Sequence, residues 1–148
     1  MKTTKILVQK SETGISEDNK AKLKSLEIYK DKKHFKFSNG WVDLAYELGK
    51  NIEQVCKLAN CELPKIEAMY NKYNSLRVDY NFTSPVPKIV ETLIDSLIYV
   101  TEDKSEMICE CCGKSCDIEI TEKNNNYINA CEKCFDRKKR EYFPECSP

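Results

Sequence analysis

Four cysteines near the end of the chain have the residue type and spacing of zinc ligands. Cys109 and Cys112 form one C-x2-C pair, Cys131 and Cys134 form another, and 18 residues separate the two pairs. Two thiolates with two residues between them converge on one side of a tight turn, so two such pairs can complete a tetrahedron around Zn²⁺. We therefore expect one structural zinc ion, in a site with no open position for substrate or water.

The residues around these cysteines predict the elements that would carry them. Gly113 follows Cys112 at a place where the turn often needs a positive φ. Residues 117–121 alternate between polar and apolar side chains, which predicts a strand that could pair with Tyr127–Ile128. Cys131 is then expected to start a helix over residues 132–142. This order of turn, hairpin and helix resembles the treble-clef zinc fingers over residues 106–148, with a zinc ribbon as the alternative.

The chain has nine cysteines, so the assignment of ligands has alternatives. Cys111, Cys116 or Cys146 could replace one of the four, and spare thiols are the other reading for these three. Some treble-clef proteins, the HNH nucleases, add a catalytic metal held by histidines. The single histidine, His34, lies far from the cysteines in sequence. We therefore expect no catalytic residues and no enzymatic activity.

A second segment, residues 52–73, resembles a helix-turn-helix unit. Cys56 supplies the small residue of its first helix, Asn60 the turn, and Ile66 a core position of the second helix, expected at Leu63–Tyr73. If the unit binds DNA, the second helix would enter the major groove. The expected base contacts are Lys65 and Asn71, and the expected phosphate contacts are Lys72 and Arg77. Glu62 and Glu67 would repel phosphate, and a plain helical core is the alternative.

Four consecutive basic residues lie beyond the last zinc ligand. They could hold a nucleic-acid backbone, or they could form the solvated end of a helix, where the macrodipole favours cations. They are Arg137, Lys138, Lys139 and Arg140.

The remaining pattern predicts an α+β fold that is mostly helical. Further helices are expected at Ser16–Leu26 with Ser16 as N-cap, at Trp41–Leu48 ended by Gly49, at Asn51–Ala59, and at Val86–Ile98; β structure is expected at Thr4–Gln9 and as a hairpin of Leu26–Tyr29 with Phe35–Phe37. The helix at Val86–Ile98 could pack in a core or form a homodimer. Thr101–Glu106 would be an acidic link.

The expected division is residues 1–40 as a small β-containing segment, 41–80 as the helix-turn-helix-like unit, 81–105 as a connecting helix and 106–148 as the zinc finger.

Composition limits the possible functions. The chain has 148 residues, 41% of them apolar, and 24 basic residues balance 24 acidic ones. The sequence shows no secretory signal or membrane span, so we expect a soluble cytoplasmic protein (or one inside a host cell, if viral) without a membrane partner. The motifs favour a DNA-binding or transcription-regulatory protein. The neutral charge favours the alternative, an adaptor or inhibitor that binds another protein such as a polymerase, a nuclease or a defence complex.

Overall fold

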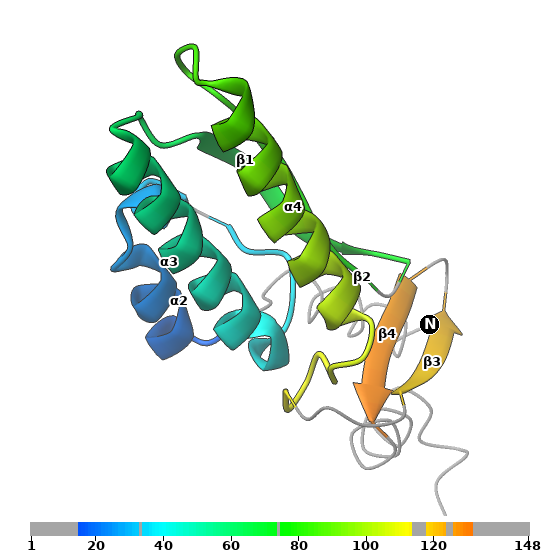
Figure 1. Cartoon of the computed structure of the whole chain (residues 1–148). Coiled ribbons are helices and arrows are strands. Elements are labelled where there is room, and N and C mark those ends of the chain that lie inside the picture. Colours follow the sequence, from blue (N-terminus) through cyan, green and yellow to red (C-terminus); the bar gives the residue numbers. More distant parts are fainter. Residues whose placement is uncertain (1–14, 33, 74, 114–117, 124–125, 132–148) are drawn as a thin grey trace, which may run out of the picture.

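The computed structural model describes residues 15–32, 34–73, 75–113, 118–123 and 126–131. In chain order the elements are α2 (Glu17–Lys24), two 3-10 turns η1 (Glu27–Tyr29) and η2 (Asn39–Trp41), α3 (Val42–Ala59), β1 (Lys65–Lys72), β2 (Ser75–Asn81), α4 (Lys88–Ser105), β3 (Ile118–Lys123) and β4 (Asn126–Cys131). The strands form two separate antiparallel pairs, β1 with β2 and β3 with β4. Figure 1 shows α3 and α4 running side by side, with α4 in front of the first pair. The predicted α+β class is confirmed.

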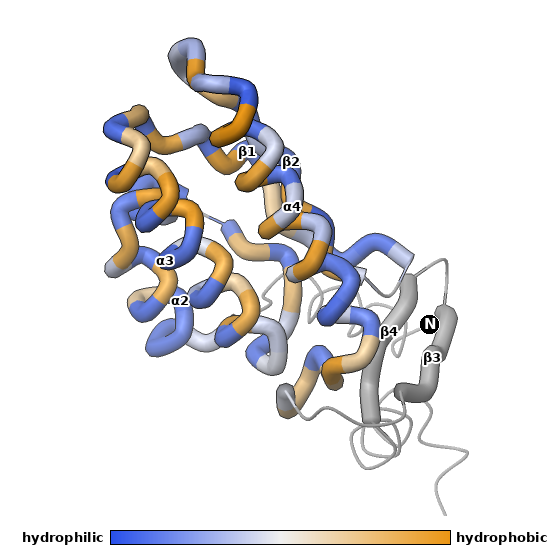
Figure 2. The backbone as a smooth tube through the Cα atoms, viewed as in Figure 1, coloured by the Kyte–Doolittle hydropathy of each residue, from blue (hydrophilic) through white to orange (hydrophobic). Residues whose placement is uncertain are grey.

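One hydrophobic core joins all the elements from α2 to α4. Its largest fully buried side chains are Trp41, Tyr29, Phe37, Leu23, Leu48, Ile52, Met69, Leu76 and Ile94. The tube in Figure 2 shows apolar residues recurring along α3 and α4. Burial of each large apolar side chain contributes about 1.5–3 kcal/mol. The core includes buried residues from both strands of the first pair, Ile66 and Met69 of β1 and Leu76 and Val78 of β2.

The predicted second helix of the helix-turn-helix unit is wrong, because residues Lys65–Lys72 form β1. Ile66 and Met69 are both buried although they are three residues apart, a spacing typical of a helix. The pairing of β1 with β2 shifts register between Ile66 and Ala68. A β-bulge at Glu67 inserts one extra residue, so a spacing of three returns to the same face of the strand. The segment 52–73 is thus the end of a helix followed by a strand.

The predicted hairpin of Leu26–Tyr29 with Phe35–Phe37 is also wrong. Residues Glu27–Tyr29 form the turn η1, and Lys36 pairs with β1 instead, through Lys36 N–H to Met69 O at 3.0 Å and Asn71 N–H to Lys36 O at 3.1 Å. Aromatic packing accompanies this arrangement of residues 27–37, because Phe35 packs edge-to-face against Tyr29 at 5.8 Å between ring centroids. Both rings are buried in the core in this arrangement.

The two helices predicted at Trp41–Leu48 and Asn51–Ala59 are a single helix, α3. Gly49 does not end it but allows close packing, since an added Cβ would lie 2.7 Å from Cε2 of Tyr29 and 2.8 Å from Cδ1 of Leu26. The predicted turn at Asn60 is confirmed, with φ 55° and ψ 46° in the left-handed region. This residue ends α3 and redirects the chain toward β1.

Helix α4 confirms the predicted amphipathic helix but continues to Ser105, through most of the expected acidic link. Side chains in its last turns accept hydrogen bonds from backbone amides of β2. The Glu102 carboxylate accepts the Val78 N–H at 3.0 Å, and the Ser105 hydroxyl oxygen accepts the Leu76 N–H at 2.8 Å. These side chains occupy the outer edge of β2, which would otherwise present unpaired amides.

The N-terminal prediction is confirmed in part. Ser16 caps α2, and its hydroxyl oxygen accepts the Asn19 N–H at 3.3 Å. The predicted strand Thr4–Gln9 lies outside the described residues. Across the part of the chain that the structure describes, no helix has the length and apolar character needed to cross a bilayer.

Candidate metal centre

The first cysteine pair lies on a closed turn that follows α4. The Gly113 N–H donates to the Cys109 carbonyl oxygen at 2.8 Å, and Gly113 has the predicted positive φ, 79°. Cys109 is fully buried, whereas Cys112 is exposed. A turn closed in this way, with glycine directly after the second cysteine, fits a C-x2-C half-site for a thiophilic metal such as zinc.

The second pair is described only through the backbone of Cys131, the last residue of β4. The predicted pairing of strands is confirmed, with Thr121 opposite Ile128 and Ile118 opposite Cys131. Cys134, Cys116, Cys146 and the expected helix over residues 132–142 lie outside the described residues. Within the described ranges no group of three or more His, Cys, Asp or Glu side chains could hold a metal. The four-cysteine site therefore stays a prediction.

Glu110, between the two cysteines of the first pair, attaches their turn to the core. Its side chain is a buried carboxylate, with the residue only 7% exposed. One carboxylate oxygen accepts the Asn71 side-chain amide at 2.7 Å, and the other accepts the Ser38 N–H at 3.1 Å. Its backbone carbonyl accepts the Gly40 N–H at 2.6 Å. Burial of a carboxylate is tolerated only with such donors, so Glu110 binds the turn to two separate segments.

Trp41 and Gly40 complete this attachment. The indole N–H of Trp41 donates to the Ile108 carbonyl oxygen at 2.9 Å. At Gly40 the backbones touch, because an added Cβ would lie 2.2 Å from the Cys109 carbonyl oxygen and 2.5 Å from the Glu110 carbonyl oxygen. Only glycine allows the turn to approach this closely.

The residues predicted to contact DNA do not lie on a helix. Lys65 and Lys72 are on β1 and Arg77 is on β2. Lys65 lies 4.0 Å from the Glu67 carboxylate, and Arg77 lies 3.9 Å from that of Glu102. The Lys72 ammonium lies 5.7 Å from the ring centroid of Tyr73, and Asn71 is bound to Glu110 as described. The predicted major-groove contacts of Lys65 and Asn71 assumed a recognition helix, and the structure has the strand β1 in its place. Contact of these residues with DNA stays a prediction that has lost this basis. Arg137, Lys138, Lys139 and Arg140 lie outside the described residues.

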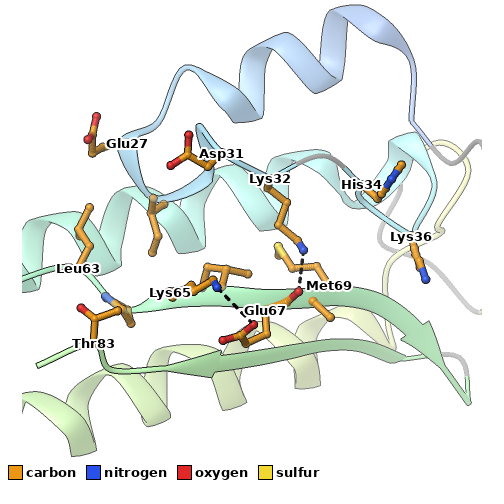
Figure 3. A pocket seen from close by; sticks show the side chains of 14 residues that line it. Glu27, Asp31, Lys32, His34, Lys36, Leu63, Lys65, Glu67, Met69 and Thr83 are labelled. Atoms are coloured by element: carbon orange, nitrogen blue, oxygen red, sulfur yellow. Dashed lines mark hydrogen bonds and ion pairs between the residues drawn. The ribbon is translucent and has the colours of Figure 1, made fainter.

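An open cleft of about 690 Å³ lies between the η1 region and the outer edge of β1. In Figure 3 Lys32 reaches across it, and its ammonium donates to the Glu67 carbonyl oxygen at 2.9 Å. Burial lowers the pKa of Lys32, against the attraction of Glu67. His34 and Lys36 lie at one end of the cleft. Three carboxylates (Glu27, Asp31 and Glu67) and three lysines (Lys32, Lys36 and Lys65) line the cleft, so neither charge is in clear excess along it.

The pKa values of two other groups, the buried Cys56 and the half-buried Glu102, are shifted by their surroundings. Burial raises the pKa of the Cys56 thiol, with a smaller effect from Cys61. A raised thiol pKa keeps cysteine protonated and unreactive, in agreement with the predicted packing role of Cys56. Burial also raises the pKa of Glu102, although the Val78 N–H and Arg77 act in the opposite direction.

The Cys109–Gly113 turn and its attachment through Glu110 thus form a specific polar arrangement among the described residues. Sequence reasoning found the cysteines and Gly113 but missed Glu110, whose partners lie 39 and 72 positions away. Comparison of the chain with protein families, with curated proteins and with solved structures gives no match.

Proposed function

We propose that this chain is a non-enzymatic, zinc-stabilised adaptor that binds another protein. In this proposal Cys109, Cys112, Cys131 and Cys134 hold one Zn²⁺ in a treble-clef finger at the C-terminal end. A four-thiolate site is closed to substrate, so the metal would stabilise the fold and carry no reaction. The donor set supports zinc, since thiolates favour it over hard cations such as Mg²⁺.

The observation that carries the adaptor function is an apolar stripe on the outer surface of α4. Ile89 is 68% exposed, Leu93 43% and Val100 47%. They are spaced by four and seven residues, so they share one face of the helix over about 16 Å. Exposed apolar residues aligned on a helix are typical of protein-binding surfaces.

Charge supports a protein partner over a nucleic acid. Basic and acidic residues balance over the chain. Lys65 and Arg77 lie beside carboxylates, and the Asn71 amide is bound to Glu110. A duplex-binding surface needs cations that are available to phosphate. The DNA-binding alternative keeps the exposed Lys72 and the four basic residues at 137–140, and those four lie outside the described residues.

A comparison of two α4 variants tests the proposal. Leu93→Glu places a charge on the stripe, and Thr92→Glu places the same charge one residue away on another exposed part of α4. Wild type and Thr92→Glu should retain the same partner protein from lysate of the source cells, and Leu93→Glu should lose it. Equal retention by all three proteins would refute the stripe as the binding surface.

Two parallel measurements separate the alternatives. If light scattering shows a dimer that Leu93→Glu dissociates, the stripe serves a second copy of the chain and the adaptor proposal fails. Binding to duplex DNA with a steep negative salt dependence, lost when residues 137–140 are neutralised, would favour the nucleic-acid function instead. The adaptor proposal expects a monomer with no measurable DNA affinity at physiological salt.

A further inference from the structure

We propose that Glu110 and Asn71 are positioning residues of the zinc site. They hold the Cys109–Gly113 turn on the helical core, so that this half-site is formed before the ion binds. This inference depends on the proposed zinc site, but it assigns a role to residues outside the ligand set and couples metal binding to the core.

The orientation of Glu110 is the first step of the argument. Glu110 lies between two predicted ligands, Cys109 and Cys112. Its carboxylate oxygens nevertheless accept hydrogen bonds from Asn71 and Ser38, which lie on the core side of the turn. Each oxygen already accepts a hydrogen bond within 3.1 Å. These two bonds hold the carboxylate against the core, and the proposal assigns it the role of an anchor for the turn.

The backbone on either side of Glu110 is fixed as well. The Ile108 carbonyl oxygen accepts the Trp41 indole N–H, and the Glu110 carbonyl oxygen accepts the Gly40 N–H. On the far side, Gly113 closes the turn onto Cys109, and an added Cβ at Gly113 would lie 3.1 Å from the Gly40 carbonyl oxygen. Both ends of the Cys109–Gly113 turn thus contact the segment that leads into α3.

This attachment has a thermodynamic consequence. A half-site held in its bound shape loses less conformational entropy when the ion binds, so its affinity is higher than that of the same cysteines on a free loop. Coupling is reciprocal, so zinc must stabilise the core by the same factor by which the core strengthens zinc binding. Loss of the Asn71 amide should weaken both.

The test compares two asparagines of the same hairpin. Asn71→Ala removes the amide that binds Glu110, and Asn81→Ala removes an amide that donates to the Glu67 carboxylate at 3.1 Å, at the other end of the hairpin. Zn²⁺ affinity is measured under reducing conditions by competition with a chromophoric chelator. Asn71→Ala should bind Zn²⁺ about tenfold or more weakly than wild type, in the usual range for residues that support ligands. Asn81→Ala should stay within about twofold of wild type.

Equal affinities for the two variants would overturn the positioning role. A wild-type protein that binds neither Zn²⁺ nor Co²⁺ through thiolates would instead refute the metal centre itself, so the two failures are distinguishable. If Asn71→Ala does not fold, Trp41→Phe removes the donor to Ile108 and keeps most of the buried ring volume. Its Zn²⁺ affinity should also fall, and an unchanged value would count against the proposal.

Discussion

The side-chain amide of Asn71 donates to the Glu110 carboxylate over 2.7 Å and joins β1 to the turn between Cys109 and Cys112. The two residues are 39 positions apart. Through this bond the cysteine turn is part of the surface of the helical core.

Asn71→Ala should destabilise the zinc-loaded protein by about 1–3 kcal/mol, because it removes a donor from a buried carboxylate. Urea denaturation followed by circular dichroism measures the free energy of unfolding. Asn81→Ala is the control, since its amide lies in an exposed hydrogen bond, and its effect should stay within about 0.5 kcal/mol. Equal effects of the two substitutions would show that the Glu110 contact contributes no special stability.

Glu102 should make the stability of the fold depend on pH in an unusual direction. Burial raises the pKa of this carboxyl above its unfolded value, against the Val78 N–H and Arg77 and together with the nearby charge of Asp79. The folded state then binds the proton more tightly, so this group's contribution to stability falls as the pH rises from the unfolded pKa through the folded one. Relative to Glu102→Gln, wild type should lose stability as the pH rises above about 4.3. A relative gain over that window would contradict the assignment.

Two isoleucines of α4 should differ sharply in their contribution to stability. Ile94 is fully buried in the core, so Ile94→Ala should cost about 2–5 kcal/mol. Ile89 belongs to the exposed stripe, so Ile89→Ala should change stability by less than about 0.5 kcal/mol. Thermal and urea denaturation of the two variants check this. Similar losses would mean that the stripe is packed in the free protein and is not available to a partner.

Trp41 should report metal release, because it is the only tryptophan and its indole N–H donates to the Ile108 carbonyl next to Cys109. Chelation of zinc should shift its fluorescence emission and lower the melting temperature recorded at that wavelength. The control is Trp41 emission in the variant Cys109→Ser with Cys112→Ser, where the chelator should have no effect. Emission and melting temperature that do not respond in wild type would show that the cysteine turn and the core are uncoupled.

Local signals in the sequence predicted the local features of the fold. Ser16 as a cap, Asn60 and Gly113 as left-handed positions, and the pairing of Tyr127–Ile128 with the preceding strand all depend on neighbouring residues, and all are confirmed. Periodicity predicts the helix α4 as far as Ile98, but not its last two turns, which reach Ser105. Each of these features is set by the preference of a short segment.

The errors arose where distant contacts decide the structure. The bulge at Glu67 gave β1 the spacing of a helix, and Gly49 was interpreted as a stop although it packs inside α3 against Tyr29. The helix-turn-helix pattern predicts a base contact for Asn71. Its neighbouring residues give no sign that its side chain binds Glu110, 39 positions away. Contacts between elements override local propensity at these positions.

Elemental analysis of the chain, purified under reducing conditions, tests the central claim most directly. The account predicts about one zinc per chain in wild type and its loss in Cys131→Ser, because a tetrahedral site needs all four thiolates. Wild-type protein that contains no metal, and whose stability toward denaturant does not change when a chelator is added, would contradict it.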